Sequence, residues 1–315
     1  MNTHQIILGD CITGMKTLPD GCVNTCITSP PYFGLRSYDG GDSEIGQEDT
    51  VDEYVQKMVE VFREVRRILR DDGTLWLNLG DSYMSAKNCA PPPQTIGGQR
   101  GMPSDFVPGN RKDQRGLKTK DLIGIPWRVA FALQADGWWL RQDVVWYKPN
   151  PMPESVTDRC TRAHEYMFML SKKSHYFYDH EAIKEAAVSP PHAPGNKNRT
   201  QPEDKGARDP ALEPERVWGS DGKKNKRSVW TVNTKGYKGA HFAVYPEELI
   251  TPCVLAGCPE DGTVFDPFTG SGTTAVVALK HGRNYIGTEL NPDYVQLAEN
   301  RIKEDVPQTL SEFLA

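Results

Sequence analysis

Long hydrophobic runs are missing from this sequence, which is 37% hydrophobic over 315 residues. No segment approaches the roughly 20 apolar residues that a helix needs to cross a bilayer. The first residues, Met1 to Gln5, also lack the basic and then apolar layout of a signal peptide. We therefore expect no membrane contact and a cytoplasmic location. The length allows one large or two ordinary domains.

A disulfide framework and a metal site are lacking as well. Seven cysteines form an odd set without regular spacing, which is typical of reduced thiols. The pairs Cys22 with Cys26 and Cys253 with Cys258 do not form the pattern of a zinc site. The His164-Glu165 pair has no second histidine at metal-binding spacing, so we interpret it as structural or positional. No metal is expected.

Positive charge is scarce overall but concentrated in two stretches. The net charge is −5, yet Met84 to Lys120 holds seven Lys and Arg against two Asp and Glu. Lys184 to Lys238 holds twelve against seven, so each stretch is +5 and the remainder is −15. An acidic body with two basic insertions suits a protein that meets nucleic-acid phosphates through limited surfaces. Solvated loops that happen to be basic are the alternative.

Short apolar runs alternate with apolar residues at helical spacing. This rhythm predicts a Rossmann-like α/β fold, with a mostly parallel sheet and helices on both faces. The expected strands are 5–10, 23–28, 74–79, 138–147, 165–170, 263–266 and 284–289, with a further strand end at 176–178. The expected helices are a turn at 15–18 and the segments 51–69, 126–136, 246–256, 273–281 and 292–303. Residues 1–315 are expected to form one domain with irregular insertions at 84–120 and 186–239.

A glycine-rich turn near the C-terminus lies between a predicted strand and a predicted helix. Asp266 ends the strand, Gly270-Ser271-Gly272 lets the backbone approach a ligand, and Thr273-Thr274 are expected to cap the helix. Ligands of open α/β sheets bind at this end of the strands. Glu289 ends the next predicted strand, where a carboxylate can accept hydrogen bonds from both ribose hydroxyls. This arrangement fits the nucleoside half of either NAD or S-adenosylmethionine. Ala275 stands in place of the third glycine of the dinucleotide fingerprint, and small residues in such a turn can also serve helix–strand packing.

A rigid loop, Thr28-Ser29-Pro30-Pro31-Tyr32, follows a predicted strand near the N-terminus. The two prolines end that strand. The Ser29 hydroxyl and the Pro30 carbonyl can accept both hydrogens of an amino group, which draws its nitrogen toward a tetrahedral arrangement. The Tyr32 ring offers a face to a base rotated out of its helix. Taken alone, this loop would be interpreted as an ordinary turn without a catalytic role.

Together and in this order, the two motifs resemble the amino-methyltransferases of DNA. The second motif runs from Phe265 to Thr274 and is followed by Ile286 to Leu290. The resemblance is to the subgroup whose catalytic motif precedes its cofactor motif, and it covers most of the chain. It extends to Phe33 to Tyr38, Trp146 to Asn150, and Thr161 to Tyr166.

The resemblance implies a circularly permuted methyltransferase fold that uses S-adenosylmethionine. The implied catalytic residues are Ser29, Pro30, Pro31 and Tyr32. The implied cofactor residues are Asp10, Cys11, Asp266, Phe268, Gly270, Ser271, Gly272, Thr273, Thr274 and Glu289. Asp10 would face the adenine side, Glu289 the ribose, and the loop from Asp266 the methionine end. The segment Ala240 to Pro246 resembles the family's other cofactor-side motif.

The resemblance also implies partners: double-stranded DNA and, for a bacterial or phage protein, a cognate restriction endonuclease as a candidate. Target recognition is expected within 186–239, with 84–120 as a second candidate surface. Within the first region, the expected DNA contacts are Lys223, Lys224, Lys226 and Arg227.

Ser29 favours N4 of cytosine as the target atom, since adenine-modifying relatives usually have Asp or Asn there; N6 of adenine is the alternative. Three rival functions remain open: a nicotinamide oxidoreductase, an RNA or protein amino-methyltransferase, and a non-catalytic nucleic-acid-binding relative. The Pro252-Cys253 dipeptide resembles the nucleophile motif of cytosine ring-carbon methyltransferases. No matching Glu-Asn-Val tripeptide occurs in the chain, so we interpret Cys253 as a buried apolar residue.

Overall fold

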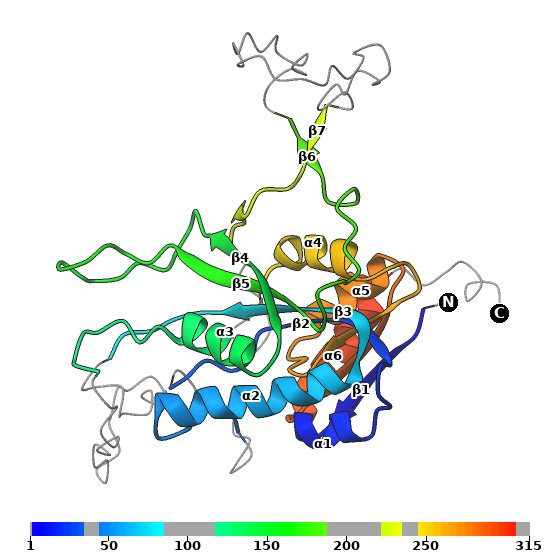
Figure 1. The fold of residues 1–315 in the computed structure, drawn as a ribbon, viewed down its shortest axis with the longest axis horizontal. Helices are drawn as coiled ribbons and strands as arrows, with labels where there is room; N and C mark the ends of the chain where they lie inside the picture. Colours follow the sequence, from blue (N-terminus) through cyan, green and yellow to red (C-terminus); the bar gives the residue numbers. More distant parts are fainter. Residues whose placement is uncertain (1, 35–43, 85–116, 188–221, 235–244, 307–315) are drawn as a thin grey trace, which may run out of the picture.

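An eight-stranded sheet organises the part of the chain that the structure describes (Figure 1). The structure is a computed structural model, and it describes residues 2–34, 44–84, 117–187, 222–234 and 245–306. Most of the two basic insertions, 84–120 and 186–239, and most of the segment 240–246 lie outside those residues. None of the helices in the described ranges has the length and apolarity of a bilayer-crossing helix.

The strand order across the sheet confirms the predicted mostly parallel arrangement. The strands are, in that order, β1 (His4–Leu8), β10 (Asn284–Glu289), β9 (Thr263–Asp266), β2 (Val23–Thr28), β3 (Leu69–Leu79), β5 (His164–Ser171), β4 (Trp139–Tyr147) and β8 (Val229–Thr231). The five strands from β1 to β3 pair in parallel. β5 runs antiparallel to both of its neighbours, and β8 pairs in parallel with β4 at the edge.

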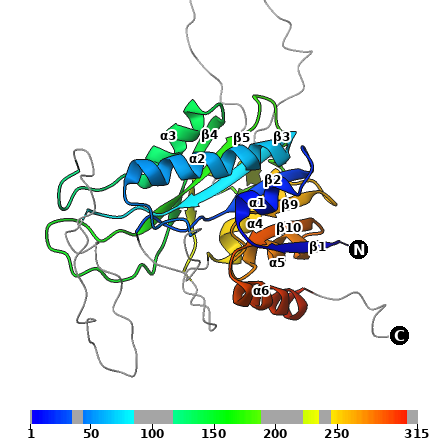
Figure 2. The same cartoon turned by 90° about the horizontal axis from the view of Figure 1, so that it is seen from below.

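Helices cover both faces of the sheet, as predicted (Figure 2). One face carries α1 (Cys11–Lys16), α2 (Val51–Ile68) and α3 (Ile125–Ala135), and the other carries α4 (Glu247–Gly257), α5 (Thr273–Lys280) and α6 (Pro292–Asp305). Each layer encloses its own cluster of buried apolar side chains. Two separate apolar layers are the consequence of strands that present buried residues to both faces.

The helix α2 shows how the local sequence sets an element. Thr50 and Glu53 form a reciprocal capping box, in which each side chain accepts from the other residue's backbone N–H. Tyr54, Met58 and Phe62, spaced by four residues, are fully buried against the sheet. The helix therefore has a fixed start and one buried face.

Several element boundaries differ from the predictions. α1 begins at residue 11 instead of 15, because Oδ1 of Asp10 caps it by accepting from the Thr13 backbone N–H at 2.9 Å. β3 begins directly after α2, and its first residues pair with β2 across a register shift. The strand end expected at 176–178 was wrong, since those residues form no strand.

Three short strands were not predicted. β8 is three residues long, and the ribbon of β6 (Glu185–Ala186) with β7 (Lys223–Lys224) has two residues in each strand. Such lengths are too short for an alternating pattern to be recognised. The ribbon stands away from the sheet, at the base of the expected target-recognition region (Figure 1).

Candidate active site

The carboxyl ends of four neighbouring parallel strands bring the two predicted motifs together. In the register of these strands, Leu8 pairs with Glu289 and Gly287 with Asp266. The next strand, β2, ends at Thr28, and the Thr28 hydroxyl donates to Oδ1 of Asp266 at 2.6 Å. The turn 266–272 and the loop 28–32, named here the cofactor turn and the catalytic loop after their predicted roles, therefore meet at one edge of the sheet, where ligands of such folds bind.

Asp266 is the hydrogen-bonding centre of this junction. It is buried, and Oδ1 accepts from the Thr28 hydroxyl and from the Phe268 backbone N–H at 3.0 Å. Oδ2 accepts from the hydroxyls of Thr274 at 2.6 Å and Tyr245 at 3.3 Å. Two donors on each oxygen use the lone-pair positions of the carboxylate. Burial raises the pKa of Asp266 in spite of these bonds, which lower it. Asp266 thus joins protein segments, and its carboxylate has no acceptor position left for a ligand.

The glycine turn has the backbone conformation that its composition predicts. Gly270 and Gly272 have φ values of 52° and 77°, in the left-handed region that favours glycine. A Cβ at Gly272 would lie 2.9 Å from Cβ of Ala298, so α6 closes that side of the turn. On this side, the turn therefore packs directly against α6.

The prediction that Thr273 and Thr274 cap α5 was wrong. Gly272 is the capping residue, without a side-chain bond, and Thr274 is turned inward to Asp266. Thr273 accepts from Arg301 at 2.7 Å, and the same guanidinium lies 3.3 Å from the Ser271 hydroxyl. These side chains are committed to the protein, which leaves backbone groups of the turn to meet a cofactor.

Glu289 keeps acceptor capacity for a ligand. Its Oε2 accepts from the Gly270 backbone N–H at 2.8 Å and its Oε1 from that of Asn291 at 2.9 Å. Each oxygen therefore retains one lone-pair position, as two ribose hydroxyls would need. Burial raises the pKa of Glu289, while hydrogen bonds from the backbone, with those of Asn291 and Gly270 first, lower it.

Two further predicted cofactor residues adjoin Glu289. The Gly9 backbone N–H donates to the Glu289 carbonyl at 2.8 Å, which places Asp10 beside it. The Cys11 thiol is buried in the core under α1, and burial raises its pKa to about 12. A contact from Cys11 would therefore come from its backbone. Phe268 packs partly against the same apolar cluster.

The catalytic loop is held rigidly from two sides. The Pro31 carbonyl accepts from the Tyr54 hydroxyl of α2 at 2.9 Å. A Cβ at Gly80 would lie 2.5 Å from Cε2 of Tyr32, so that ring rests directly on the backbone after β3. The Tyr32 hydroxyl lies 3.0 Å from Oε2 of Glu165 and 3.2 Å from Oδ1 of Asn78. The loop thus presents Ser29 and Tyr32 in a fixed orientation.

Sequence reasoning did not assign Asn78, Glu165, Lys148 or Tyr54 to this site, and it included Tyr245 only as part of the segment Ala240 to Pro246. Asn78 carried a usable signal, since it is a polar residue in the otherwise apolar end of a strand. Glu165 and Lys148 lie inside the segments that extended the resemblance, yet nothing in their spacing predicted that they form an ion pair. Tyr54 has an ordinary place on the buried face of a helix.

The four expected DNA contacts lie at the base of the β6–β7 ribbon. Arg227 and Lys224 lie 2.5 Å and 3.6 Å from Oε1 of Glu185. The Lys226 ammonium is 5.1 Å from the centre of the Trp230 ring. The side chains of Lys223 and Arg227 are exposed. The group is thus accessible, but part of its charge is already balanced within the protein.

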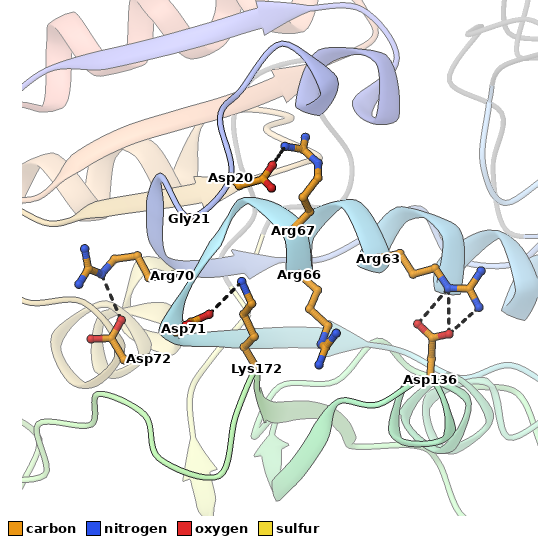
Figure 3. Close-up of a pocket in the computed structure, with 10 residues that line it drawn as sticks. All are labelled: Asp20, Gly21, Arg63, Arg66, Arg67, Arg70, Asp71, Asp72, Asp136 and Lys172. Atoms are coloured by element: carbon orange, nitrogen blue, oxygen red, sulfur yellow. Dashed lines mark hydrogen bonds and ion pairs between the residues drawn. The ribbon is translucent and has the colours of Figure 1, made fainter.

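A depression of about 1070 Å³ lies at the opposite edge of the sheet, beside the last turns of α2 (Figure 3). Its walls include five cations and four carboxylates: Arg63, Arg66, Arg67, Arg70, Lys172, Asp20, Asp71, Asp72 and Asp136. Four of the cations form ion pairs with those carboxylates. Because the charges are nearly balanced and the catalytic loop is at the other edge, this depression is not the candidate site.

Comparisons with known proteins decide the family. The family model for N6 and N4 DNA methyltransferases, described as DNA methylase, matches residues 23–300. The chain belongs to this DNA methylase family. Membership confirms the resemblance drawn from the two motifs and identifies the protein as a DNA amino-methyltransferase.

Similar proteins include two Type II methyltransferases. The chain is 45% identical over 304 residues to the Type II methyltransferase M.Cfr9I of Citrobacter freundii, covering 96% of this chain and 89% of that protein. It is 46% identical over 308 residues to the Type II methyltransferase M.SmaI of Serratia marcescens, covering 96% and 91%.

Solved structures share the fold. The cytosine-N4-specific PvuII DNA methyltransferase superposes with a TM-score of 0.63 at 18% identity, covering 100% of this chain and 90% of that one. M1.HpyAVI in complex with S-adenosylmethionine has a TM-score of 0.53 at 16% identity, covering 95% and 99%. These likenesses confirm the methyltransferase fold of this DNA methylase.

Proposed function

We propose that this DNA methylase transfers a methyl group from S-adenosylmethionine to N4 of cytosine in duplex DNA, as the modification enzyme of a Type II system. The hydrogen bond between Thr28 and Asp266 carries the proposal, because it fixes the catalytic loop beside the cofactor turn. The Type II methyltransferases named above support the substrate class. Ser29 supports cytosine, and the fold shared with a cytosine-N4-specific enzyme agrees with it.

The residues present fit S-adenosylmethionine. Glu289 offers two acceptor positions where a ribose would lie, and Gly270, beside it in the left-handed turn, carries no Cβ that would block a ligand. Asp10 follows the neighbouring strand at the same edge. The bound cofactor supplies an electrophilic methyl group on a sulfonium.

The catalytic loop supplies acceptors for the target amine. An exocyclic amine is a poor nucleophile because its lone pair is delocalised into the base. The Ser29 hydroxyl and the Pro30 carbonyl would accept its two hydrogens, which offsets the positive charge that develops on the nitrogen. Tyr32 would stack on the extruded base. The rigid support of the loop favours catalysis by positioning.

The DNA surface is proposed to include the β6–β7 ribbon with Lys223, Lys224, Lys226 and Arg227. Phosphate contacts there would position the duplex without specifying its sequence. A cognate restriction endonuclease is the proposed partner of the system.

The experiment is methylation of genomic DNA by the purified protein with labelled S-adenosylmethionine. Nucleosides from the product are separated and identified by mass spectrometry, and RNA and protein serve as competing substrates. We expect N4-methylcytosine, absent with Ser29→Ala and strongly reduced with Tyr32→Ala, while both variants still bind cofactor. N6-methyladenine alone would overturn the target atom but leave the reaction type, whereas methylated RNA or protein without methylated DNA would overturn the substrate class.

A further inference from the structure

The direction of the Ser29 hydroxyl matters for the proposed reaction. A hydroxyl can both donate and accept, but only its oxygen lone pairs can receive a hydrogen from the target amine. Ser29 must therefore donate its own hydrogen elsewhere while the amine is bound. Its Oγ lies 3.5 Å from the hydroxyl oxygen of Tyr32. This separation is long, and bonds of catalytic groups often tighten only when substrate binds.

The surroundings of Tyr32 decide which way that bond runs. The Tyr32 hydroxyl faces Oε2 of Glu165 at 3.0 Å and Oδ1 of Asn78 at 3.2 Å. The amide of Asn78 is oriented by the Tyr166 carbonyl, which lies 3.1 Å from Nδ2 and can only accept. Both groups facing Tyr32 are therefore acceptors. Tyr32 directs its single hydrogen toward them and leaves its lone pairs toward Ser29.

Glu165 is paired with a cation that is largely shielded from solvent. The Lys148 ammonium forms an ion pair with Oε1 of Glu165, and each of the two side chains is 16% exposed. The same ammonium lies 4.2 Å from the centre of the Trp146 ring. A charged acceptor forms a stronger hydrogen bond with a hydroxyl than a neutral one does. Burial and the Glu165 charge raise the pKa of Tyr32 well above its usual value, so Tyr32 remains a donor.

We propose that Glu165, paired with Lys148, is a positioning residue that acts through Tyr32 to fix the Ser29 hydroxyl as a hydrogen-bond acceptor for the target amine. Hydrogens then run in one direction, from Ser29 to Tyr32 and from Tyr32 to Glu165. The free lone pairs of Ser29 accept from an amino group and disfavour a keto oxygen at the same place. This inference rests on the proposed function and adds to the site a residue of β5, Glu165, and the residue that follows β4, Lys148.

Glu165→Gln tests the direction with little change in shape. Lys148 can only donate, so the oxygen of the new amide turns toward Lys148 and its nitrogen toward Tyr32. The Tyr32 hydroxyl would then accept a hydrogen bond from the amide nitrogen of residue 165. It would no longer donate its own hydrogen to that residue. We expect kcat to fall about 10-fold to 100-fold, a smaller loss than that for removing a direct contact to a transition state. The dissociation constants for S-adenosylmethionine and DNA are expected to stay within about twofold of wild type.

Tyr32→Phe supplies the second arm, because it removes the hydroxyl and keeps the ring. If the two residues act in one relay, the Tyr32→Phe/Glu165→Gln protein has the same kcat as Tyr32→Phe alone. A merely structural role for Glu165 would instead give losses that multiply. The control is Glu64→Gln, which alters an ion pair with Arg67 on α2 and should leave kcat unchanged.

The outcomes separate the two proposals. A wild-type protein that does not methylate DNA refutes the proposed function. An active wild type with a Glu165→Gln variant of equal kcat, or with multiplied losses in the double variant, overturns the relay alone. Equal melting temperatures for wild type and Glu165→Gln exclude unfolding as the cause of a lower kcat.

Discussion

Replacement of Asp266 tests whether its carboxylate holds protein segments together or contacts the cofactor directly. In Asp266→Ala, the Thr28 hydroxyl and the Phe268 backbone N–H lose their acceptor. The hydroxyls of Tyr245 and Thr274 lie close enough to bond each other once the carboxylate is gone, but one of their two hydrogens then loses its acceptor. Three donors left without that acceptor, at about 1–3 kcal/mol each, give a loss of about 3–9 kcal/mol in the free energy of unfolding. Loss of cofactor binding would follow from disorder of the turn.

Asp266→Asn should be far milder. The Phe268 N–H can only donate, so the amide oxygen stays on the Oδ1 side, where Thr28 also donates. The amide nitrogen then faces Thr274 and Tyr245, whose hydroxyl oxygens can accept from it. We expect a loss of less than about 1.5 kcal/mol, because every buried group keeps a partner.

Because the pKa of Asp266 is raised, the difference in stability between wild type and Asp266→Asn should also depend on pH. A carboxyl whose folded pKa is raised contributes stability that is fully present below its unfolded pKa and is lost as pH rises through the folded value. The stability of wild type minus that of Asp266→Asn should therefore be largest in acid, below the unfolded pKa of about 4, and fall as pH rises through the raised folded pKa. Urea unfolding across this range, with calorimetric titration of S-adenosylmethionine at neutral pH, measures both effects. An Asp266→Ala protein of wild-type stability with lost cofactor affinity would refute this reasoning and make the carboxylate a direct ligand.

Three further variants test other parts of the site. Glu289→Gln should weaken S-adenosylmethionine binding by about 1.5–3 kcal/mol, and wild-type affinity in calorimetry would contradict the ribose assignment. The melting temperature should fall as well, because the new amide nitrogen must face the backbone N–H of either Gly270 or Asn291. Gly80→Ala should displace the Tyr32 ring and lower single-turnover methyl transfer while cofactor affinity holds; an unchanged rate would show that the ring position is unimportant. Replacing the four ribbon cations, Lys223, Lys224, Lys226 and Arg227, with Gln should flatten the salt dependence of DNA binding. The slope should change by less than about 0.9 for each cation removed, because Glu185 already pairs with two of them, and an unchanged slope would exclude this surface.

The sequence predicted the elements that have a clear hydrophobic period or clear boundary residues. Apolar residues at helical spacing predicted α2 to within one residue at its end, and the cofactor strand and its glycine turn were located correctly. The start of α1 was missed because its signal is the side chain of Asp10, which was interpreted as a ligand residue at the end of a strand 5–10, whereas β1 ends at Leu8. β8 and the β6–β7 ribbon were missed because two or three residues carry no period, and their partners are distant in sequence.

The roles of side chains were harder to predict than their positions. Asp266 and Thr274 were correctly located at the cofactor turn, but their interaction with each other and with Thr28 depends on which way buried side chains point. Spacing along one strand gives the face of a side chain, not its partner on another strand. For the same reason, the hydrogen bond from Tyr54 to the Pro31 carbonyl could not be read from a helical pattern that serves packing equally well.

The topology explains both what was found and what was missed at the site. Thr28 and Asp266 are 238 positions apart, yet they share a hydrogen bond because β2 and β9 are parallel neighbours that end at the same edge. A search for polar residues at the ends of predicted strands therefore finds this part of the site. β5 runs the other way, so it brings its first residues to that edge, and Glu165 follows the start of the strand instead of its end. The antiparallel strand β5 thus supplies Glu165, the proposed acceptor for the Tyr32 hydroxyl. The sequence alone does not give the direction of β5, so it could not place Glu165 at this edge.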